Sequence, residues 1–327
     1  MIRTALLALL LAQQDTVIRT TVVNVQVPVT VLDKKGTYIT GLTEKDFQVY
    51  DAGGLQKIQV DEAVQPISLV VAVQTNSRAR DGFPLIRKAS ALLLPLVAGA
   101  SGEIAVVAFD HRVEVLAPFT SNEAEIGAAF AKLKPGSTPH HLDDAAMEAV
   151  RMLRTRETGH KRIILLISEA FDQGSSVKPS DVFELAEREG ILIYSVNMKQ
   201  VRTPAPPVSP IPPENRAPRP MGDMQTQTSD ARVVTVGGGV FRGHFGDNNL
   251  ATYAQFTGAS TQEFTNQKRL EAAIVNIGKE VHSQYLLTFA PQDREPGYHE
   301  LAVSVTTPDL KVRARRGYWL AAQAEVR

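Results

Sequence analysis

The stretch of sequence that decides the fold is ISLVVAV, residues 67–73. Its apolar side chains are continuous rather than alternating, which is typical of a parallel strand that is covered on both faces. The run ends at the polar segment QTNSR, residues 74–78, and a helical pattern follows. A buried strand that leads through a polar turn into a helix is the repeating unit of an α/β sheet.

Three further apolar runs repeat this pattern, at residues 104–109, 163–167 and 191–196. Helical patterns between and after them place apolar side chains on one face: Leu85, Ala89, Leu92 and Leu96; Leu142, Ala146, Ala149 and Leu153; and Leu270, Ile274, Ile277 and Val281. The sequence therefore predicts a doubly wound, mostly parallel α/β sheet with right-handed crossovers. Residues 113–116 are predicted to add an antiparallel edge strand through a hairpin.

Both ends of the chain have the character of antiparallel strands. Valines recur at alternate positions between Val25 and Val31, within a β segment at residues 17–62. Three more strands are predicted near the carboxyl end, at residues 285–289, 301–305 and 312–316. We interpret the basic stretch RARR, residues 313–316, as a solvated edge strand that is protected by its charge.

These patterns predict the domain organisation. An N-terminal β segment, residues 13–65, and a C-terminal β segment, residues 284–327, together form a β-rich module around an α/β domain at residues 66–283. The α/β domain carries an insertion at residues 202–232, which has eight prolines between residues 202 and 220. Such a segment cannot bury enough apolar surface to offset its ordering entropy, so we predict that it is extended and mobile. The glycine-rich segment at residues 237–246 is predicted to be a flexible loop.

The composition excludes several classes of function. The chain has 35 Lys and Arg residues and 35 Asp and Glu residues, so no net field favours nucleic acid or an anionic membrane. It has no cysteine, which excludes disulfides, thiolate metal sites and cysteine nucleophiles. No acid–base pair and no nucleophile motif stands out, which argues against an enzyme.

Residues 1–12 have the pattern of a signal peptide, with Arg3 before a short apolar core and Ala12 before Gln13. The apolar stretch is shorter than the roughly 20 residues that span a bilayer, so no integral span is expected in the mature chain. We therefore predict an exported protein, periplasmic or secreted. A buried first strand or helix is the alternative interpretation of this segment.

Several segments together resemble the von Willebrand factor type A fold, and most closely the bacterial VWFA-related proteins that are abundant in Acidobacteria. They are VTVLDKKG at residues 29–36, TGLTEKDFQVY at residues 40–50, SQYLL at residues 283–287 and RRGY at residues 315–318. Each segment alone is a weak signal, but the combination is specific and covers nearly the whole mature chain.

The resemblance implies a metal-ion-dependent adhesion site at the carboxyl ends of the central strands, with oxygen ligands around a hydrated Mg²⁺. Matching the family's motifs places Gln74, Asn76 and Arg78 at the ligand positions of the first loop. Thr138 matches the threonine of the second loop, and Asp144 matches its accompanying acid. In the third loop, Ser168-Glu169-Ala170 stands where the family has Ser-Asp-Gly.

The departures from this motif predict a degenerate site without a cofactor. Gln74 is neutral where the family has an anchoring carboxylate. Arg78 brings a fixed cation toward the ion, and such repulsion is worth on the order of 4 kcal/mol at about 4 Å and intermediate dielectric. If Mg²⁺ were nevertheless bound, its ligands would be Asn76, Thr138, Asp144 and Glu169.

The predicted function is a non-catalytic, adhesion-type module of the cell envelope or exterior that binds a protein partner. The expected contact surface is formed by Asn76, Ser77, Arg78, Thr138, His140, His141 and Glu169. Arg78 could replace the ion by binding an acidic side chain of the partner in a bidentate fork.

Two other functions stay open on the sequence. One is a metal-dependent envelope hydrolase that uses His140, His141 and Asp144. Adjacent histidines disfavour it, because zinc ligands on a helix are usually one turn apart. The other is a structural scaffold whose contacts are made by the β-rich module or by the proline-rich insertion.

Overall fold

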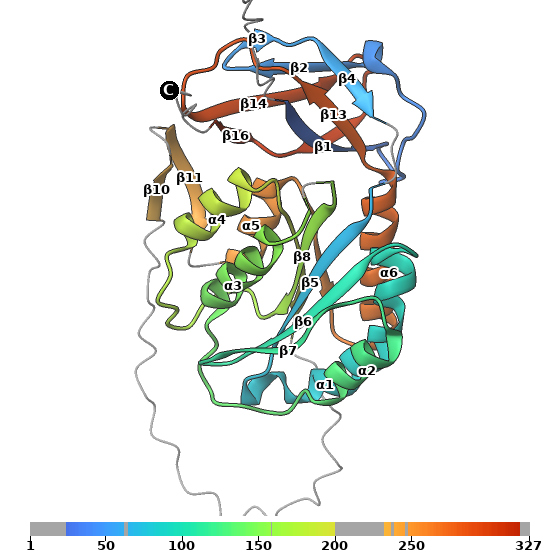
Figure 1. The fold of residues 1–327 in the computed structure, drawn as a ribbon, viewed down its shortest axis with the longest axis vertical. Helices are drawn as coiled ribbons and strands as arrows, with labels where there is room; N and C mark the ends of the chain where they lie inside the picture. The colour runs from blue at the N-terminus through green and yellow to red at the C-terminus, as the bar shows by residue number, and fades with distance from the viewer. Residues whose placement is uncertain are drawn as a thin grey trace, which may run out of the picture.

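The computed structural model describes residues 24–61, 65–157, 159–199, 232–236, 239–245 and 248–320. The predicted signal peptide and residues 202–231 of the predicted insertion lie outside these residues. Figure 1 shows two layered units, an α/β unit and a β module at one end of it. None of the helices in the described ranges is both long and apolar enough to cross a membrane.

The predicted fold class is confirmed, because the described strands of the α/β unit form one six-stranded sheet in the order β12-β9-β8-β5-β6-β7. All neighbours are parallel except β6 and β7. The strands are β5 (Ile67–Gln74), β6 (Glu103–Phe109), β7 (Val113–Thr120), β8 (Lys161–Ser168), β9 (Leu192–Met198) and β12 (Thr261–Phe264). The four apolar runs and the antiparallel edge strand lie where the sequence predicts them, whereas β12 was not predicted.

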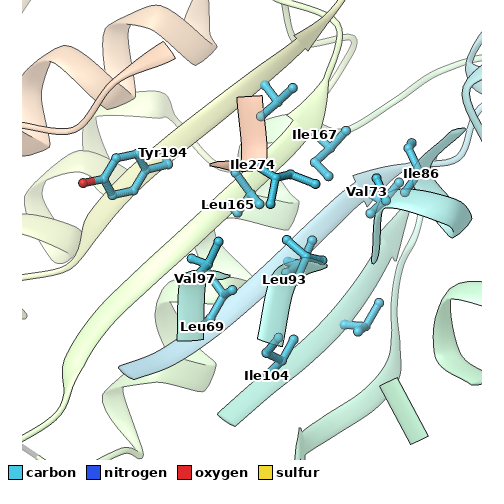
Figure 2. Packing of buried hydrophobic residues seen from close by; sticks show 14 of the residues in the cluster. Leu69, Val73, Ile86, Leu93, Val97, Ile104, Leu165, Ile167, Tyr194 and Ile274 are labelled. Atoms are coloured by element: carbon cyan, nitrogen blue, oxygen red, sulfur yellow. The ribbon is translucent and has the colours of Figure 1, made fainter. Parts of the chain in front are cut away.

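Helices cover both faces of this sheet, as the continuous apolar strands require. One face packs against α1 (Phe83–Ala89), α2 (Glu123–Ala131) and α6 (Gln267–Ser283). The other face packs against α3 (Leu142–Arg154), α4 (Pro179–Arg188) and α5 (Asn249–Thr257). Figure 2 shows Leu165 of β8 beside Ile274 of α6 in the first of these cores, to which Leu69 and Val73 of β5 also belong.

The helix predicted from Leu85 to Leu96 is irregular. It is α-helical only to Ala89, then passes through a 3₁₀ turn, η3 (Ser90–Leu92), into a short π-helix, η4 (Leu94–Ala98), which contains Pro95. Proline removes a backbone donor and disturbs regular helix geometry, which accounts for the change. Leu96 is consequently 36% exposed instead of buried.

The two ends of the chain interleave in the β module. One antiparallel sheet has the order β15-β1-β13-β4 and the other has the order β16-β14-β2-β3. The N-terminal strands are β1 (Val25–Leu32), β2 (Phe47–Asp51), β3 (Gly54–Leu55) and β4 (Ile58–Asp61), and the C-terminal strands are β13 (Tyr285–Phe289), β14 (Gly297–Val305), β15 (Lys311–Ala314) and β16 (Gly317–Leu320). The alternating valines of β1 face the core between the sheets. The boundaries at residues 65 and 283 stay a prediction.

Charged side chains join the two units. Arg313 donates from Nη2 to Oε2 of Glu280 on α6 at 2.7 Å, and Glu280 is 1% exposed. Arg315 is 9% exposed and lies close to the buried Glu187 of α4. The interpretation of residues 313–316 as a solvated edge strand is right for the position of β15 at the sheet edge and for the exposed Arg316. It was wrong for Arg313 and Arg315, which α6 and α4 engage.

Beyond β9, the described chain resumes with a hairpin of β10 (Arg232–Val236) and β11 (Gly239–Phe245). The prediction of a flexible loop at residues 237–246 was therefore wrong for residues 239–245, since these form a strand that pairs antiparallel with β10. Glycine is uncommon in strands, and this explains why its abundance here favoured a loop.

Candidate functional site

The predicted site lies at the carboxyl ends of β5, β6 and β8, on the side of the sheet away from the β module. We use the name top face for the surface formed there by the loops at residues 75–82, 110–112, 134–141 and 169–178. The register of β5 and β8 pairs Val73 with Ile167, so the next residues, Gln74 and Ser168, come side by side. Ligands of open α/β sheets bind at such strand ends.

Gln74 is the centre of a buried hydrogen-bond network. Its Oε1 accepts from Oγ of Ser168 and from the backbone N of Glu169, both at 2.7 Å. Its Nε2 donates to Oδ1 of Asn76 at 2.8 Å and to Oε2 of Glu169 at 3.0 Å. Gln74 is 0% exposed, so all four hydrogen bonds that its amide can make are satisfied inside the protein.

Asn76 connects the first loop to the second. It caps the 3₁₀ helix η2 (Ser77–Gly82), because its Oδ1 also accepts from the backbone N of Ala79 at 3.1 Å. Its Nδ2 donates to the carbonyl of Thr138 at 2.9 Å. Asn76 is fully buried and holds the two loops at a fixed separation.

His140 connects the second loop to the third. Its Nε2 lies 2.8 Å from the carbonyl of Phe171, to which it can only donate. Burial lowers the pKa of His140, although the carbonyl of Phe171 and nearby carboxylates oppose this effect. The other ring nitrogen, Nδ1, lies 3.1 Å from Oε1 of Gln173 and 3.3 Å from Nδ2 of Asn76.

Arg78 and Glu169 form the charged part of the site. Nε of Arg78 lies 3.7 Å from Oε1 of Glu169, while the other carboxylate oxygen is held by Gln74. The side chain of Arg78 is 51% exposed and that of Glu169 is 20% exposed. The guanidinium therefore lies at the surface, with its Nε edge turned to Glu169.

The structure brings most predicted site residues together, but at different depths. Ser77, Arg78 and Thr138 are exposed on the top face, and His141 and Glu169 are partly exposed. Asn76 and His140 are fully buried beneath them, so they support the predicted contact surface and are not part of it. The reason is that their side chains bond between the loops instead of pointing to solvent.

Asp144 is not part of the same cluster. Its Oδ1 accepts from the backbone N of Ser176 and of Val177, both at 2.9 Å, and its Oδ2 lies 3.4 Å from Nδ1 of His141. These bonds hold the carboxylate against the segment that precedes α4. The predicted group of His140, His141 and Asp144 therefore does not converge, because His140 bonds to Phe171 instead.

The sequence reasoning missed one supporting carboxylate, Asp110. Its Oδ2 accepts from the backbone N of Ser137 and its Oδ1 from the backbone N of Arg112, both at 2.8 Å. Burial raises the pKa of Asp110, but these hydrogen bonds outweigh burial and the pKa is lowered. A Cβ at Gly136 would collide with this carboxylate, so the glycine before Ser137 was the signal in the sequence.

These residues do not fit the divalent cation that the fold family implies. The oxygens of Gln74 and Asn76 each accept two hydrogen bonds already, while a cation needs free oxygen lone pairs at about 2.1 Å. Glu169 is engaged by Arg78 and Gln74. Within the described ranges, no three His, Asp or Glu side chains are grouped so that they could hold a metal ion.

The comparisons with known proteins agree with this fold. The family model of the von Willebrand factor type A domain matches residues 76–172, which include η2, the strands β6, β7 and β8 and most of the top-face loops. This part of the chain is therefore similar to the von Willebrand factor type A domain. A search of curated protein sequences found no significant match.

Solved structures similar to this chain include an aerotolerance-related membrane protein from Bacteroides fragilis, with 15% identity, 66% of this chain and 98% of that chain covered, and a TM-score of 0.43. BatB from Bacteroides thetaiotaomicron has 14% identity, covers 65% and 99%, and has a TM-score of 0.44. Proximal thread matrix protein 1 from the mussel byssus, with a zinc-occupied MIDAS motif, has 12% identity, covers 70% and 49%, and has a TM-score of 0.45. Similarities of this size carry no information about what the chain binds.

Proposed function

We propose that this chain is a non-catalytic protein-binding module whose top face works without a metal ion. The observation that carries this proposal is the position of Arg78, a permanent cation on the surface beside the place where the family holds its ion. In the family, the ion receives a carboxylate of the partner. Arg78 can receive the same group, because only the Nε edge of its guanidinium is turned to Glu169.

The buried network beneath Arg78 supports a degenerate metal site. Gln74 is an amide where a carboxylate would anchor the ion, and its hydrogen bonds to Ser168, Glu169 and Asn76 hold the first and third loops together. An ion usually joins these loops. Here we propose that the hydrogen bonds of the neutral Gln74 amide do so, which makes the arrangement of the top face independent of magnesium.

The charges around Arg78 favour an acidic partner. Arg80, Arg112, Lys132 and Lys134 are exposed near this end of the sheet, and in the part of the chain that the structure describes they have no ion-pair partner within 4.0 Å. The exposed acids near them are Asp81 and Glu114, fewer than the exposed cations. Because the whole chain has no formal net charge, this face is more basic than the average surface and would steer an acidic segment toward it.

We further propose that the protein is exported and works in the envelope or outside the cell, as a bacterial VWFA-related protein. The signal-like pattern of residues 1–12 and the lack of cysteine support this location. Mass spectrometry of the exported fraction should find a mature chain that begins near Gln13. An intact Met1 on a protein of the cytosolic fraction would contradict export.

The binding proposal is tested by capturing partners with immobilised protein in EDTA-containing buffer. Arg78→Ala should lose the captured protein, and Arg78→Lys should weaken it, because lysine keeps the charge but not the bidentate fork. Arg151→Ala is the matched control, since Arg151 is an exposed arginine on α3 whose ion pair is with its neighbour Glu148.

If Arg78→Ala still captures the partner, the contact lies on another surface, as expected for a scaffold whose top face binds nothing. Capture that disappears in EDTA would restore an ion-dependent mechanism.

A further inference from the structure

A cavity of about 250 Å³ lies between the α/β unit and the β module, at the end of the sheet opposite the top face. Thr40 and Leu42 of the β module line one side of it. Ile67 and Lys161, at the beginnings of β5 and β8, line another side. The turn from α6 into β13, around Ser283, closes it. The cavity therefore touches each segment that joins the two units.

The lining of this cavity includes Lys161 and one carboxylate, Asp61. Oδ2 of Asp61 accepts from Oγ1 of Thr288, and no ion pair within 4.0 Å joins Asp61 to Lys161. Nζ of Lys161 donates to the carbonyl of Val281 at 2.8 Å and lies 3.5 Å from Oε1 of Gln284. No carboxylate among the described residues lies within 4.0 Å of this nitrogen. A lysine ammonium has three protons to donate, so the third has no acceptor in the described part of the chain.

The surroundings do not neutralise this cation. Burial lowers the pKa of Lys161 to about 8, and no neighbouring charge of the described residues raises it again. The carbonyl of Val281 belongs to the last turn of α6, where the helix dipole supplies only a partial negative charge. Cations removed from water are normally paired, whereas the partly buried Lys161 lines the cavity without a carboxylate partner among the described residues.

The lining of the cavity indicates the class of ligand. Leu42, Val60, Ile67 and Leu286 offer apolar surface, and the hydroxyl groups of Thr40 and Ser283 lie in the same wall. A phosphate group carries more charge than one lysine can match, and proteins usually bind it with arginines or at a helix N-terminus. Here the nearby helix end is a C-terminus, whose partial negative charge disfavours a doubly charged anion more than a singly charged one.

We infer that this cavity is a binding site for a small monocarboxylate with a short aliphatic tail, whose carboxylate pairs with Lys161. The tail would contact apolar residues of both units. This site is independent of the proposed contact through Arg78, because it lies at the other end of the sheet. A bound carboxylate would stabilise the junction between the α/β unit and the β module.

The experiment measures thermal unfolding of the full chain with sodium propionate and, at equal ionic strength, with sodium chloride. Propionate should raise the melting temperature of the wild-type protein, since a ligand that binds the native state stabilises it by mass action. Lys161→Met keeps the aliphatic stem and should abolish the shift. Lys132→Met, at an exposed lysine, is the matched control and should keep it. Propionamide should give no shift, because it has the same shape without the charge.

A second measurement does not depend on whether the variant folds. NMR titration of the Lys161 side chain in the wild-type protein should show that saturating propionate raises its pKa by about one unit or more, since a close opposite charge favours the charged form. Equal stabilisation by propionamide, or an unchanged titration of Lys161, would overturn the inference. So would a fall in the pKa of Lys161 in Asp61→Asn without propionate, because Asp61, which also lines the cavity, would then be the counter-ion.

Discussion

Gln74 and Glu169 are joined by two hydrogen bonds of opposite direction. Oε1 of Gln74 accepts from the backbone N of Glu169 at 2.7 Å, and Nε2 of Gln74 donates to Oε2 of the Glu169 side chain at 3.0 Å. One amide thus bonds to both the backbone and the carboxylate of Glu169. The same carboxylate lies 3.7 Å from Nε of Arg78. A metal site would need an oxygen pointing at the ion from each of these positions.

This relationship predicts a large loss of stability in Gln74→Ala. The hydroxyl of Ser168 and the backbone N of Glu169 would lose their acceptor in a buried place, which should cost about 2–4 kcal/mol of the free energy of unfolding. Equilibrium unfolding in urea measures it. Gln48→Ala, at an exposed glutamine of β2, should change stability by no more than about 0.5 kcal/mol. Equal losses in both variants would contradict the role of the network.

The sequence was sufficient for the α/β fold because each central strand is apolar on both faces. The run at residues 67–73 and its three counterparts lack an exposed polar face. Their pattern therefore indicates parallel strands that are covered by helices on both sides. The strand β12, with the sequence TQEF, has no such run and was missed. Its pairing with β9 depends on tertiary contacts.

The sequence predicted at which strand ends the candidate site residues lie, but not how deeply each side chain is buried. The alignment of loops followed from the resemblance, and the neutral charge of Gln74 indicated that the ion chemistry is altered. The burial of Asn76 and His140 could not be read from the sequence, since both residue types are usually found at surfaces. Their partners are a carbonyl of Thr138 and a carbonyl of Phe171, and backbone atoms leave no signature in the sequence.

The contact between α6 and the π-helix η4 predicts that Gly278→Ala is destabilising. A Cβ at Gly278 would collide with the carbonyl of Leu96, a backbone atom that cannot rotate away. We expect a loss of about 1–3 kcal/mol. Gly127→Ala is the matched control, because Gly127 is also helical and a Cβ there meets nothing within 4 Å. That variant should gain about 0.5–1 kcal/mol from helix propensity. Thermal unfolding compares the two variants, and a stabilised Gly278→Ala would contradict the packing.

Glu187 predicts how stability depends on pH. Burial raises the pKa of Glu187 to about 8, although the guanidinium of Arg315 acts in the opposite direction. In the described part of the chain, neither carboxylate oxygen has a hydrogen-bond partner. A raised pKa means that the folded state keeps a proton that the unfolded state loses above about pH 4.3. The contribution of Glu187 is therefore fully present at lower pH and is lost as pH rises through about 8, by at most ~1.4 kcal/mol per pH unit.

Glu187→Gln should remove this dependence, because glutamine is neutral throughout. The stability of the variant relative to the wild type should rise between pH 5 and about pH 8 in urea unfolding curves. Glu184→Gln, at a partly exposed glutamate of the same helix that pairs with Arg188, should show a difference that does not grow in this window. A difference between Glu187→Gln and wild type that is constant with pH would mean that Glu187 is ionised in the folded protein.

The last prediction concerns the proposed loss of the metal site. Millimolar Mg²⁺ should leave the melting temperature of the wild-type protein unchanged, since the amides of Gln74 and Asn76 use their oxygens for internal hydrogen bonds. The double change Gln74→Asp with Arg78→Ser should create measurable Mg²⁺ affinity, because it restores an anchoring carboxylate and removes the guanidinium from Glu169. Asn76→Ser should increase this affinity further, because a hydroxyl is shorter than an amide.

Calorimetric titration with Mg²⁺ and with Mn²⁺ measures each step. A clear rise in the melting temperature of the unmodified protein with Mg²⁺ would contradict the loss of the metal site and would support an ion-bridged contact at the top face. If the double variant binds neither Mg²⁺ nor Mn²⁺, the three loops do not converge on one point even when their ligands are restored.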